Sequence, residues 1–377
     1  MKQVIQDLKK GNTFVQEVPT PLNKEGHVLI ESKNSLVSIG TERTLVNFGN
    51  SNYLQKAMQQ PEKVRQAIDK IKTEGVASTY SAITAKLDEP MPLGYCNAGV
   101  VLESSVEGIS VGDRVISNGV HAEVVRIPKN LCAKIPDNVD FESASFAVLG
   151  SVALQGIRLA SPALGERVVV FGLGLVGLMT VQMLLASGCK VLGIDFDSKR
   201  CELAKSYGAD IVDLSKDEDP IENASLFSDN LGVDAVIITA STKSDEVIQN
   251  AAEMCRKRGK IVLVGVVGLN LRRENFYEKE ITFQVSSSYG PGRYDEAYEN
   301  EGIDYPIGFV RWTENRNFQA VLEMMSTGKL DVSSLITHRF DIEDASEAYE
   351  NLNDPSAIAI ILNYGNSQPI SKDPIII

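Results

Sequence analysis

The 377-residue sequence contains no apolar run long enough to cross a membrane. A spanning helix needs about 20 consecutive apolar residues, and the N-terminal MKQVIQDLKKGNTF also lacks the continuous apolar core of a secretion signal. Basic residues are in the minority, with 37 Lys and Arg against 50 Asp and Glu and a formal net charge of −13. That charge argues against binding to nucleic acid or to an anionic membrane surface. We expect a cytoplasmic protein with neither kind of partner.

Residues that build disulfide frameworks and metal sites are also scarce. The three histidines are dispersed along the chain. The five cysteines are odd in number and never form a Cys-x-x-Cys pair: Cys96, Cys132, Cys189, Cys201 and Cys255. This scatter argues against a disulfide framework and a local zinc motif, and it is typical of reduced cytoplasmic thiols.

The chain is long enough for two domains, and its first 150 residues are rich in short strands. Runs such as HVLIESKNSLVSIGT and HAEVVRIP place β-branched residues between turn signals. One segment breaks the pattern, because QPEKVRQAIDKIKTEG has apolar residues at helical spacing. We predict a helical insertion at about 54–88, which either packs on the surface or covers a site as a lid.

From about residue 153 the pattern changes to strands that alternate with helices. RVVVFG, KVLGID, DAVIITAS and KIVLVGVVG are predicted strands, and LVGLMTVQMLLASG, SKRCELAKSYG and SDEVIQNAAEMCRKRG are predicted helices. This alternation predicts an α/β fold with a parallel sheet. The chain ends with a helix in FQAVLEMMSTGK, a helix and strand in DASEAYENLNDPSAIAIIL, and a tail, NYGNSQPISKDPIII, that has no predicted partner and resembles a linker.

The segment VVVFGLGLVGLMT carries a G-x-G-x-x-G motif. It follows a predicted strand and opens a predicted helix, and Asp195 comes 18 residues after Gly177 at the end of the next strand. In this context the motif predicts dinucleotide binding: Gly172 permits the tight turn, Gly174 admits the pyrophosphate, and Gly177 lets the helix pack on the strand. The alternative is a glycine-rich turn that binds nothing.

The carboxylate of Asp195 is expected to accept hydrogen bonds from the adenosine ribose and to repel a 2′-phosphate, which favours NAD over NADP. Lys199 and Arg200 lie close enough in sequence to weaken that preference. The predicted cofactor-binding residues are Gly172, Gly174, Leu175, Val176, Gly177, Asp195, Arg200, Thr239 and Gly265.

Together with SVEGISVGDRV, LGSVALQGI and GIDFDSKRCELAKSYGAD, the fingerprint resembles the medium-chain dehydrogenase/reductase family, which includes the zinc alcohol dehydrogenases. The resemblance implies a Rossmann domain with a doubly wound parallel sheet at 153–288. It also implies a GroES-like, β-rich catalytic domain made of 1–152 and 289–377. Members of the family are often dimers or tetramers, so a homodimer is a possible partner state.

A closer resemblance is to the N-terminal half of bacterial bi-domain oxidoreductases of surface-polysaccharide gene clusters. It is carried by GTER, PLGYCNAGVV, NGVHAEVV, SYGPGRYD and PIGFVRWTENRN, and GTER also occurs in the similar bacteriochlorophyllide dehydrogenases. It implies a sugar-derived small-molecule substrate. It also raises the possibility that a second, C-terminal oxidoreductase module is missing from this chain.

The motifs that supply zinc ligands in the family are altered here. The CGTD position reads Ile39-Gly40-Thr41-Glu42, the GHE position reads Gly94-Tyr95-Cys96, and the third ligand position falls near Gly150-Ser151. Isoleucine cannot bind zinc, tyrosine is a rare zinc ligand, and serine is a poor one. The four-cysteine lobe of the structural zinc site is also missing. We predict an enzyme without zinc.

Without a metal, a side chain must move the alcohol proton. Tyr95 occupies a former ligand position, and a phenol with a reference pKa of about 10 is a proton donor at neutral pH. Thr41 matches the hydroxyl that relays protons in the family. We predict Tyr95, Thr41 and His121 as catalytic candidates. The alternatives are that Tyr95 only lines the site, that His121 is a core histidine, and that Cys96 is a buried thiol.

The segment SSSYGPGRYD returns the chain to the catalytic domain, near the expected nicotinamide. Tyr289, Arg293 and Tyr294 are the predicted substrate residues, because a guanidinium can bind a carboxylate or phosphate through paired hydrogen bonds. Arg311 and Trp312 are second candidates. The alternative is a glycine-proline turn with solvated side chains.

Three functions remain open from the sequence. The leading prediction is a zinc-independent, NAD(H)-dependent oxidoreductase that acts on a hydroxyl or carbonyl group of a polar substrate. The second is an NADPH-dependent quinone or enoyl reductase. The third is a non-catalytic dinucleotide-binding module of a larger bi-domain protein.

Overall fold

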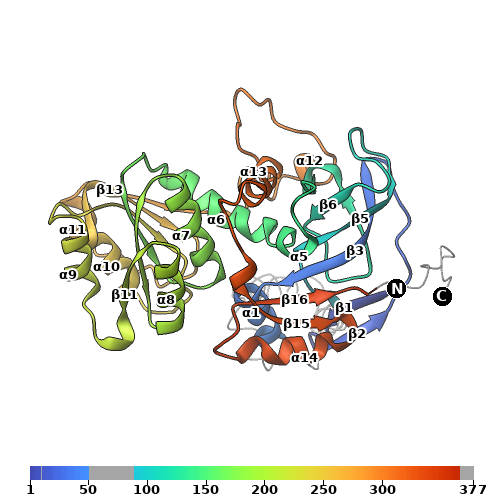
Figure 1. Cartoon of the computed structure of the whole chain (residues 1–377), viewed down its shortest axis with the longest axis horizontal. Coiled ribbons are helices and arrows are strands. Elements are labelled where there is room, and N and C mark those ends of the chain that lie inside the picture. The colour runs from blue at the N-terminus through green and yellow to red at the C-terminus, as the bar shows by residue number, and fades with distance from the viewer. Residues whose placement is uncertain (10, 51–88, 366–377) are drawn as a thin grey trace, which may run out of the picture.

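The structure is a computed structural model that describes residues 1–9, 11–50 and 89–365. Its elements form two lobes, with α6 between them (Figure 1). The predicted helical insertion at about 54–88 lies outside the described residues.

The strands are β1 (Lys2–Gln6), β2 (Thr13–Glu17), β3 (His27–Val37), β4 (Met91–Pro92), β5 (Asn97–Ser104), β6 (Arg114–Ser117), β7 (Val124–Pro128), β8 (Cys132–Lys134), β9 (Arg167–Phe171), β10 (Lys190–Asp195), β11 (Asp210–Asp213), β12 (Val233–Ile238), β13 (Cys255–Leu263), β14 (Thr282–Val285), β15 (Ile336–Asp341) and β16 (Ala359–Asn363).

The helices are α1 (Ile39–Asn50), α5 (Phe141–Ala144), α6 (Ala147–Ala160), α7 (Leu175–Ala186), α8 (Ser198–Ser206), α9 (Pro220–Phe227), α10 (Glu246–Met254), α11 (Arg273–Tyr277), α12 (Glu296–Glu299), α13 (Glu314–Ser326) and α14 (Ala345–Glu350).

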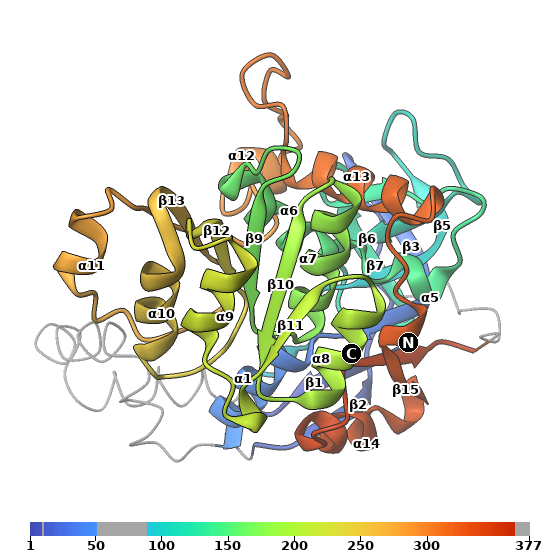
Figure 2. The same cartoon turned by 60° about the vertical axis from the view of Figure 1, so that its left-hand side comes forward.

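Six parallel strands form the sheet of one lobe, in the order β11-β10-β9-β12-β13-β14. This is the strand order of a doubly wound dinucleotide-binding sheet. Alternate side chains of the central strand β9 enter different cores. Val168 and Val170 share a buried cluster with α6 and α7, whereas Val169 and Phe171 share one with α9 and α10. Figure 2 shows these helices on the two sides of the sheet.

The other lobe is built on β-strands from both ends of the chain. Its larger sheet has the order β15-β16-β3-β5-β6-β8, and β7 also pairs with β3. A smaller sheet has the order β2-β1-β4. The C-terminal strand β16 pairs antiparallel with β3, with Asn363 opposite Asn34. The C-terminal strands β15 and β16 are therefore part of the same sheet as β3.

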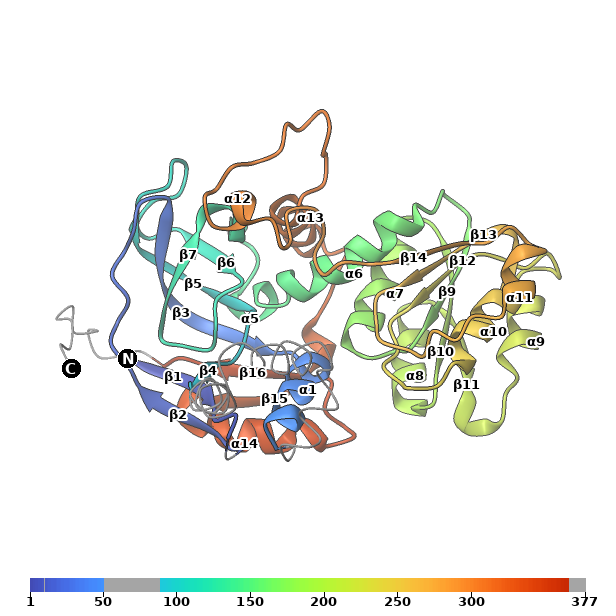
Figure 3. The same cartoon turned by 180° about the vertical axis from the view of Figure 1, so that it is seen from behind.

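Helix α6 connects the two lobes. It packs against α13 on one side and α7 on the other, and it runs between the lobes in the view from behind (Figure 3). The predicted domain boundary at 152/153 falls inside this continuous helix. The helix therefore makes a stiff, shared connection between the lobes.

Two local predictions from the sequence differ from the structure. The helix predicted for SDEVIQNAAEMCRKRG ends at Met254, and Cys255 already begins β13. The C-cap Cys255 has an extended backbone, and the basic run that follows it belongs to the strand, with Arg258 in the left-handed region at φ +60°. The short strand β11 and the edge strand β14 were not predicted.

The prediction of an unpartnered tail from residue 363 is wrong at its start. Asn363 is the last residue of β16, and Tyr364 is 3% exposed with its hydroxyl 2.7 Å from Ser35 Oγ. Within the described part of the chain, no helix is long and apolar enough to cross a membrane.

Candidate functional site

The glycine fingerprint forms the turn between β9 and α7. Gly172 has φ +100°, a region that favours glycine, and a Cβ there would lie 2.5 Å from the backbone nitrogen of Ala240. A Cβ on Gly177 would lie 2.0 Å from the carbonyl oxygen of Gly172. Both positions therefore require glycine for close packing of the turn, the helix and the neighbouring strand.

Gly174 stands apart from the other two glycines because a Cβ there would meet nothing within 4 Å. It is the N-cap of the 12-residue helix α7 and makes no side-chain cap bond, and Leu175 and Val176 are the first helical residues. The first backbone N–H groups of a helix have no acceptor within it, and the space beside Gly174 is open at this positive end of the helix dipole. This arrangement fits the pyrophosphate of a dinucleotide.

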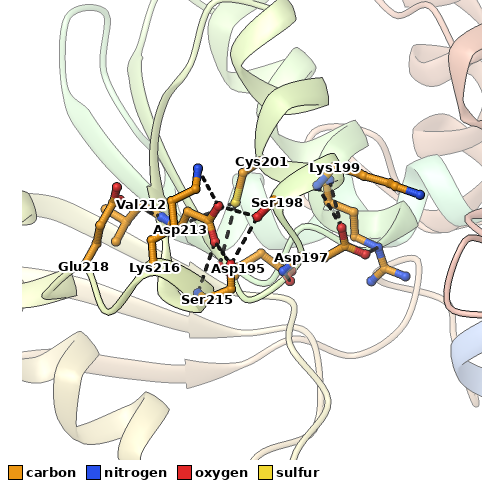
Figure 4. Close-up of polar contacts among 11 residues, drawn as sticks. Asp195, Asp197, Ser198, Lys199, Cys201, Val212, Asp213, Ser215, Lys216 and Glu218 are labelled. Carbon is orange, nitrogen blue, oxygen red and sulfur yellow. Dashed lines mark hydrogen bonds and ion pairs between the residues drawn. The ribbon is translucent and has the colours of Figure 1, made fainter.

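Asp195 is the last residue of β10 and lies at the carboxyl edge of the parallel sheet (Figure 4). Its Oδ2 accepts a hydrogen bond from the backbone N–H of Leu173 at 2.5 Å, and its Oδ1 accepts one from Asp197 at 2.9 Å. Each oxygen keeps a free lone pair. The carboxylate is thus held in place beside the fingerprint and can still accept a ribose hydroxyl.

A second aspartate, Asp213 at the end of β11, fixes the start of α8. It is buried and accepts hydrogen bonds from the hydroxyls of Ser198 at 2.5 Å and Ser215 at 2.6 Å. These hydroxyls, together with the ion pair to Lys216, hold the pKa of the Asp213 carboxyl well below its usual range. Asp213 therefore anchors the loop that carries Asp195 and Asp197. The sequence analysis missed it, although its place at a strand end was a usable signal.

Arg200 lies on α8 and is paired with Asp197, whose Oδ2 is 3.4 Å from its Nε. Arg43, on α1 of the other lobe, is close enough to Arg200 that its pKa is lowered by burial and then by that positive charge. Arg43 also donates a hydrogen bond to the carbonyl oxygen of Leu352. The first turns of α1 thus lie near the ribose end of the predicted cofactor site. Arg43 is a candidate that the sequence analysis missed.

Thr239 and Gly265 follow β12 and β13 at the same sheet edge. The Thr239 hydroxyl donates to the carbonyl oxygen of Gly172, so it braces the fingerprint turn. A Cβ on Gly265 would lie 2.1 Å from the carbonyl oxygen of Ala240. The structure therefore brings all nine predicted cofactor residues to one edge of the parallel sheet, through β9, β10, β12, β13, α7 and α8.

Tyr95 lies between β4 and β5, and its hydroxyl meets the beginning of α1. The phenol oxygen is 2.8 Å from Ser38 Oγ and 3.2 Å from Thr41 Oγ1. A phenol carries one proton, so Tyr95 can donate to one of these hydroxyls and accept from the other. Burial, the neighbouring Cys96 and Glu42 raise the pKa of Tyr95 well above its usual range. Tyr95 therefore stays protonated at neutral pH.

The residues at the former zinc-ligand positions do not form a zinc donor set. Ile39 has no donor atom, and Tyr95 offers only a phenol oxygen, which is not one of the usual zinc donors. The Ser151 hydroxyl donates within its own helix, to Ala147 at 2.8 Å. Within residues 1–9, 11–50 and 89–365, no three His, Cys, Asp or Glu side chains are grouped to hold a metal ion.

His121 lies in the bend before β7, not in a strand, and is fully buried. Its Nε2 is 3.3 Å from Glu42 Oε2, and its Nδ1 is 2.7 Å from Ser35 Oγ. Tyr349, on α14, also donates to Glu42. Direct contact between His121 and a substrate is therefore blocked in this structure. The sequence analysis missed Glu42 and its tyrosine partner, which come from opposite ends of the chain.

The predicted substrate residues do lie together. The Arg293 guanidinium carbon is 5.4 Å from the Tyr289 ring centroid and 4.1 Å from that of Tyr294. Arg293 also pairs with Glu299, at 2.5 Å between Nη1 and Oε1. Tyr289 is buried, which raises its pKa to about 12, and Tyr294 is 76% exposed. The guanidinium charge is thus already matched by a carboxylate, so the role of Arg293 as an anion clamp stays a prediction.

A cavity of about 540 Å³ lies beside α13. Its lining includes Arg311, Trp312 and Tyr298. The guanidinium carbons of Arg158 and Arg311 are 3.4 and 3.8 Å from the Trp312 ring centroid, so these three side chains are packed together. The fingerprint and Tyr95 do not line this cavity.

Comparisons with known proteins agree with the fold. Residues 176–301 match the family model of the zinc-binding dehydrogenases. The chain is 28% identical over 233 residues to YdjJ of Escherichia coli K12, an uncharacterized zinc-type alcohol dehydrogenase-like protein, and this match covers 59% of the chain and 57% of YdjJ. L-idonate 5-dehydrogenase of Vitis vinifera is 27% identical over 320 residues, 73% of this chain and 80% of that protein.

Galactitol-1-phosphate dehydrogenase from Escherichia coli has a similar structure, with a TM-score of 0.74 and 18% sequence identity over 97% of this chain and all of that one. The α/β fold class, a Rossmann sheet with a GroES-like β-rich lobe, is confirmed. The chain is an oxidoreductase, and over most of its length it is similar to enzymes of the medium-chain dehydrogenase/reductase type. In this oxidoreductase the predicted cofactor residues lie on the Rossmann lobe, and Tyr95 and Thr41 lie on the GroES-like lobe.

Proposed function

We propose that the oxidoreductase transfers hydride between NAD(H) and an alcohol or carbonyl carbon of a sugar-derived substrate, without zinc. The observation that carries this proposal is the Tyr95 phenol. It occupies a position that supplies a metal ligand in zinc enzymes of the family, and it is bonded to the hydroxyls of Ser38 and Thr41. In a zinc enzyme the metal polarises the carbonyl oxygen. Without a metal, a protonated phenol can serve as the acid instead.

The chemistry expected of the chain's residues follows from this geometry. When bound, the nicotinamide supplies or accepts the hydride. In reduction, the O–H bond of Tyr95 breaks as its proton moves to the carbonyl oxygen, and Thr41 or Ser38 returns a proton to the phenolate. In oxidation, the alcohol proton moves to Tyr95 by the reverse path. Thr41 is exposed, so it can exchange this proton with water.

A preference for NAD is supported by the acidic edge of the cofactor site. Asp195 and Asp197 both present carboxylates where the adenosine ribose is expected, and like charge disfavours a 2′-phosphate. Arg200, a basic residue in the first turn of α8, is paired with Asp197. The balance of charge therefore supports NAD(H).

The substrate class is supported by the relatives. The two named enzymes among them act, by their names, on L-idonate and galactitol 1-phosphate, which are polyhydroxylated. A role in surface-polysaccharide metabolism is supported only by the resemblance of the sequence motifs. We propose a polyol or keto-sugar substrate for this chain.

The first experiment measures cofactor binding and turnover on chelator-treated protein of measured zinc content. We expect NADH to bind more tightly than NADPH, and at least one member of a panel of ketoses and polyols to be turned over. In Asp195→Ser the NADPH-to-NADH affinity ratio should rise about tenfold, equivalent to about 1.4 kcal/mol. Absence of turnover until zinc is added, or an unchanged ratio in Asp195→Ser, contradicts the proposal.

A further inference from the structure

A group of buried polar side chains lies directly behind Tyr95. The Glu42 carboxylate accepts hydrogen bonds from the Ser38 backbone N–H at 2.8 Å, from the Tyr349 hydroxyl, and from His121 Nε2 at 3.3 Å. The Glu42 side chain is 0% exposed, Ser38 is 4% exposed and Tyr349 is 4% exposed. These three partners satisfy the oxygens of a carboxylate that has no contact with water.

The positions of the donors assign the protons of the neighbouring histidine. A carboxylate beside Nε2 favours the tautomer of His121 that carries its proton there, and in that tautomer Nδ1 accepts from Ser35 at 2.7 Å. Ser35 Oγ in turn lies 2.7 Å from the Tyr364 hydroxyl, which can donate to it. In this arrangement Tyr364 donates to Ser35, Ser35 donates to His121, and His121 donates to Glu42. Each donor in the series has an acceptor.

The order of hydroxyl, imidazole and carboxylate in this group resembles that of a hydrolase triad. Ser35, His121 and Glu42 are each 0% exposed, however. Ser35 also lies inside β3, which is paired on both sides. No substrate can reach its hydroxyl, so the group has no hydrolytic role.

The group instead reaches Tyr95 through the beginning of α1. Glu42 holds the backbone of Ser38, and the side chains of Ser38 and Thr41 hold the Tyr95 phenol. Glu42 lies in the first turn of α1, where a carboxylate is also stabilised by the helix dipole. Burial is the main cause of the raised pKa of Cys96 and of Tyr364, and the negative charge of Glu42 raises both further. Glu42 therefore holds the position of Ser38, one of the two hydroxyl partners of the phenol.

We propose that Glu42 and His121 are positioning residues, which lock the first turn of α1 and thereby aim the Tyr95 hydroxyl. This inference rests on the proposed role of Tyr95 as proton donor. Glu42 and His121 do not touch the substrate, and their effect passes through Ser38 and Thr41.

The direct test follows Tyr95 itself, independently of turnover. In protein labelled with fluorotyrosine, the Tyr95 resonance in the 19F spectrum is the one that disappears in Tyr95→Phe. In Glu42→Gln, which keeps the shape but removes the charge, we expect this resonance to shift. The control Glu142→Gln removes a carboxylate from an exposed ion pair with Arg339, and the resonance should stay in place. An unmoved Tyr95 resonance in folded Glu42→Gln overturns the proposal.

Kinetics distinguish positioning from a purely structural role. With a substrate that the panel identifies, Glu42→Gln should lower kcat by about 10²-fold, because a small misplacement of a catalytic group has effects of that size. KM and the NADH affinity should stay near the wild-type values. The double variant Glu42→Gln/Tyr95→Phe should be no slower than Tyr95→Phe alone. Additive losses overturn the inference.

The role of Tyr95 as proton donor and the positioning role of Glu42 can be disproved separately. If Tyr95→Phe retains full turnover, the proposed function fails, while the 19F spectra still report whether Glu42 orients Tyr95. If Glu42→Gln does not fold, Tyr349→Phe removes only one of the three donors to Glu42. His121→Asn removes another of these donors. Both variants should shift the Tyr95 resonance, and in the same direction. No shift in either variant overturns the proposal.

Discussion

Glu314 begins α13 with a fully buried side chain whose charge is not matched by a bonded partner. In the described part of the chain, neither carboxylate oxygen has a hydrogen-bond partner. Burial, then the negative charge of Glu299, raises the pKa of Glu314 from 4.5 to about 8, against the opposing effect of Arg293. The folded protein therefore holds this proton more tightly than the unfolded chain does.

That proton predicts how stability depends on pH. Between pH 4.5 and 8 the folded state keeps the Glu314 proton and the unfolded state has lost it. The free energy of unfolding should therefore fall as pH rises through this window, by at most about 1.4 kcal/mol per pH unit from this group. Urea unfolding at pH 5 and pH 8.5 measures the change.

Glu314→Gln is the matched variant, because an amide stays neutral at every pH. It should equal wild type near pH 5 and be more stable than wild type at pH 8.5. Glu142→Gln, which alters a partly exposed ion pair with Arg339, serves as control and should keep the wild-type slope. Parallel pH curves for wild type and Glu314→Gln would show that Glu314 does not hold a proton in the folded state.

Single residues differ in how far the sequence could place them. Gly172 was assigned correctly to the turn after β9, and Gly177 to the close packing of α7, because the spacing of the motif reports a local steric requirement. Glu42 and His121 meet across 79 positions of sequence, and no periodic pattern marks such a pair. The sequence therefore indicated Tyr95 as a candidate but not the buried groups behind it.

At the scale of elements, the contact between β9 and α7 depends on two glycines with different roles. A Cβ on Gly177 would lie 2.0 Å from a backbone oxygen, whereas a Cβ on Gly174 would meet nothing within 4 Å. Gly177→Ala should therefore force the helix away from the strand and cost about 1–3 kcal/mol of stability. NADH affinity should fall with it.

Gly174→Ala separates binding from packing. It should leave the melting temperature near that of wild type and still weaken NADH binding, because the new methyl group lies where the pyrophosphate is expected. Thermal unfolding and NADH fluorescence titration of both variants test this pair. Wild-type stability and affinity in Gly177→Ala would contradict the account of the turn.

Elements with strong local patterns were predicted well, and short or shared ones were not. The apolar runs of β9, β10, β12 and α7 stand out in sequence, as buried parallel strands and helices do. The strands β11 and β14 are four residues long and carry little pattern. Tyr364 was assigned to a linker because its partner, Ser35, lies near the other end of the chain, and local sequence does not reveal such a contact.

At the scale of the whole molecule, the surroundings of Tyr95 are assembled from distant parts of the chain. Residues 35–42 supply Ser38 and Thr41, and α14 and β16 bring Tyr349 and Tyr364 from the C-terminal region. The first turns of α1 also approach α8 of the Rossmann lobe. There the positive charge of Arg200 contributes to the lowered pKa of Arg43. The predicted proton donor and the predicted cofactor site are thus connected through one helix.

The most direct test of the central claim is the turnover of Tyr95→Phe beside wild type, with both proteins free of zinc by elemental analysis. The account predicts that wild type keeps its activity after chelation. It also predicts that Tyr95→Phe loses about 10²–10⁴-fold in kcat, as expected for removal of a general acid, with NADH affinity unchanged. Full turnover in Tyr95→Phe, or wild-type activity that requires zinc, would contradict it.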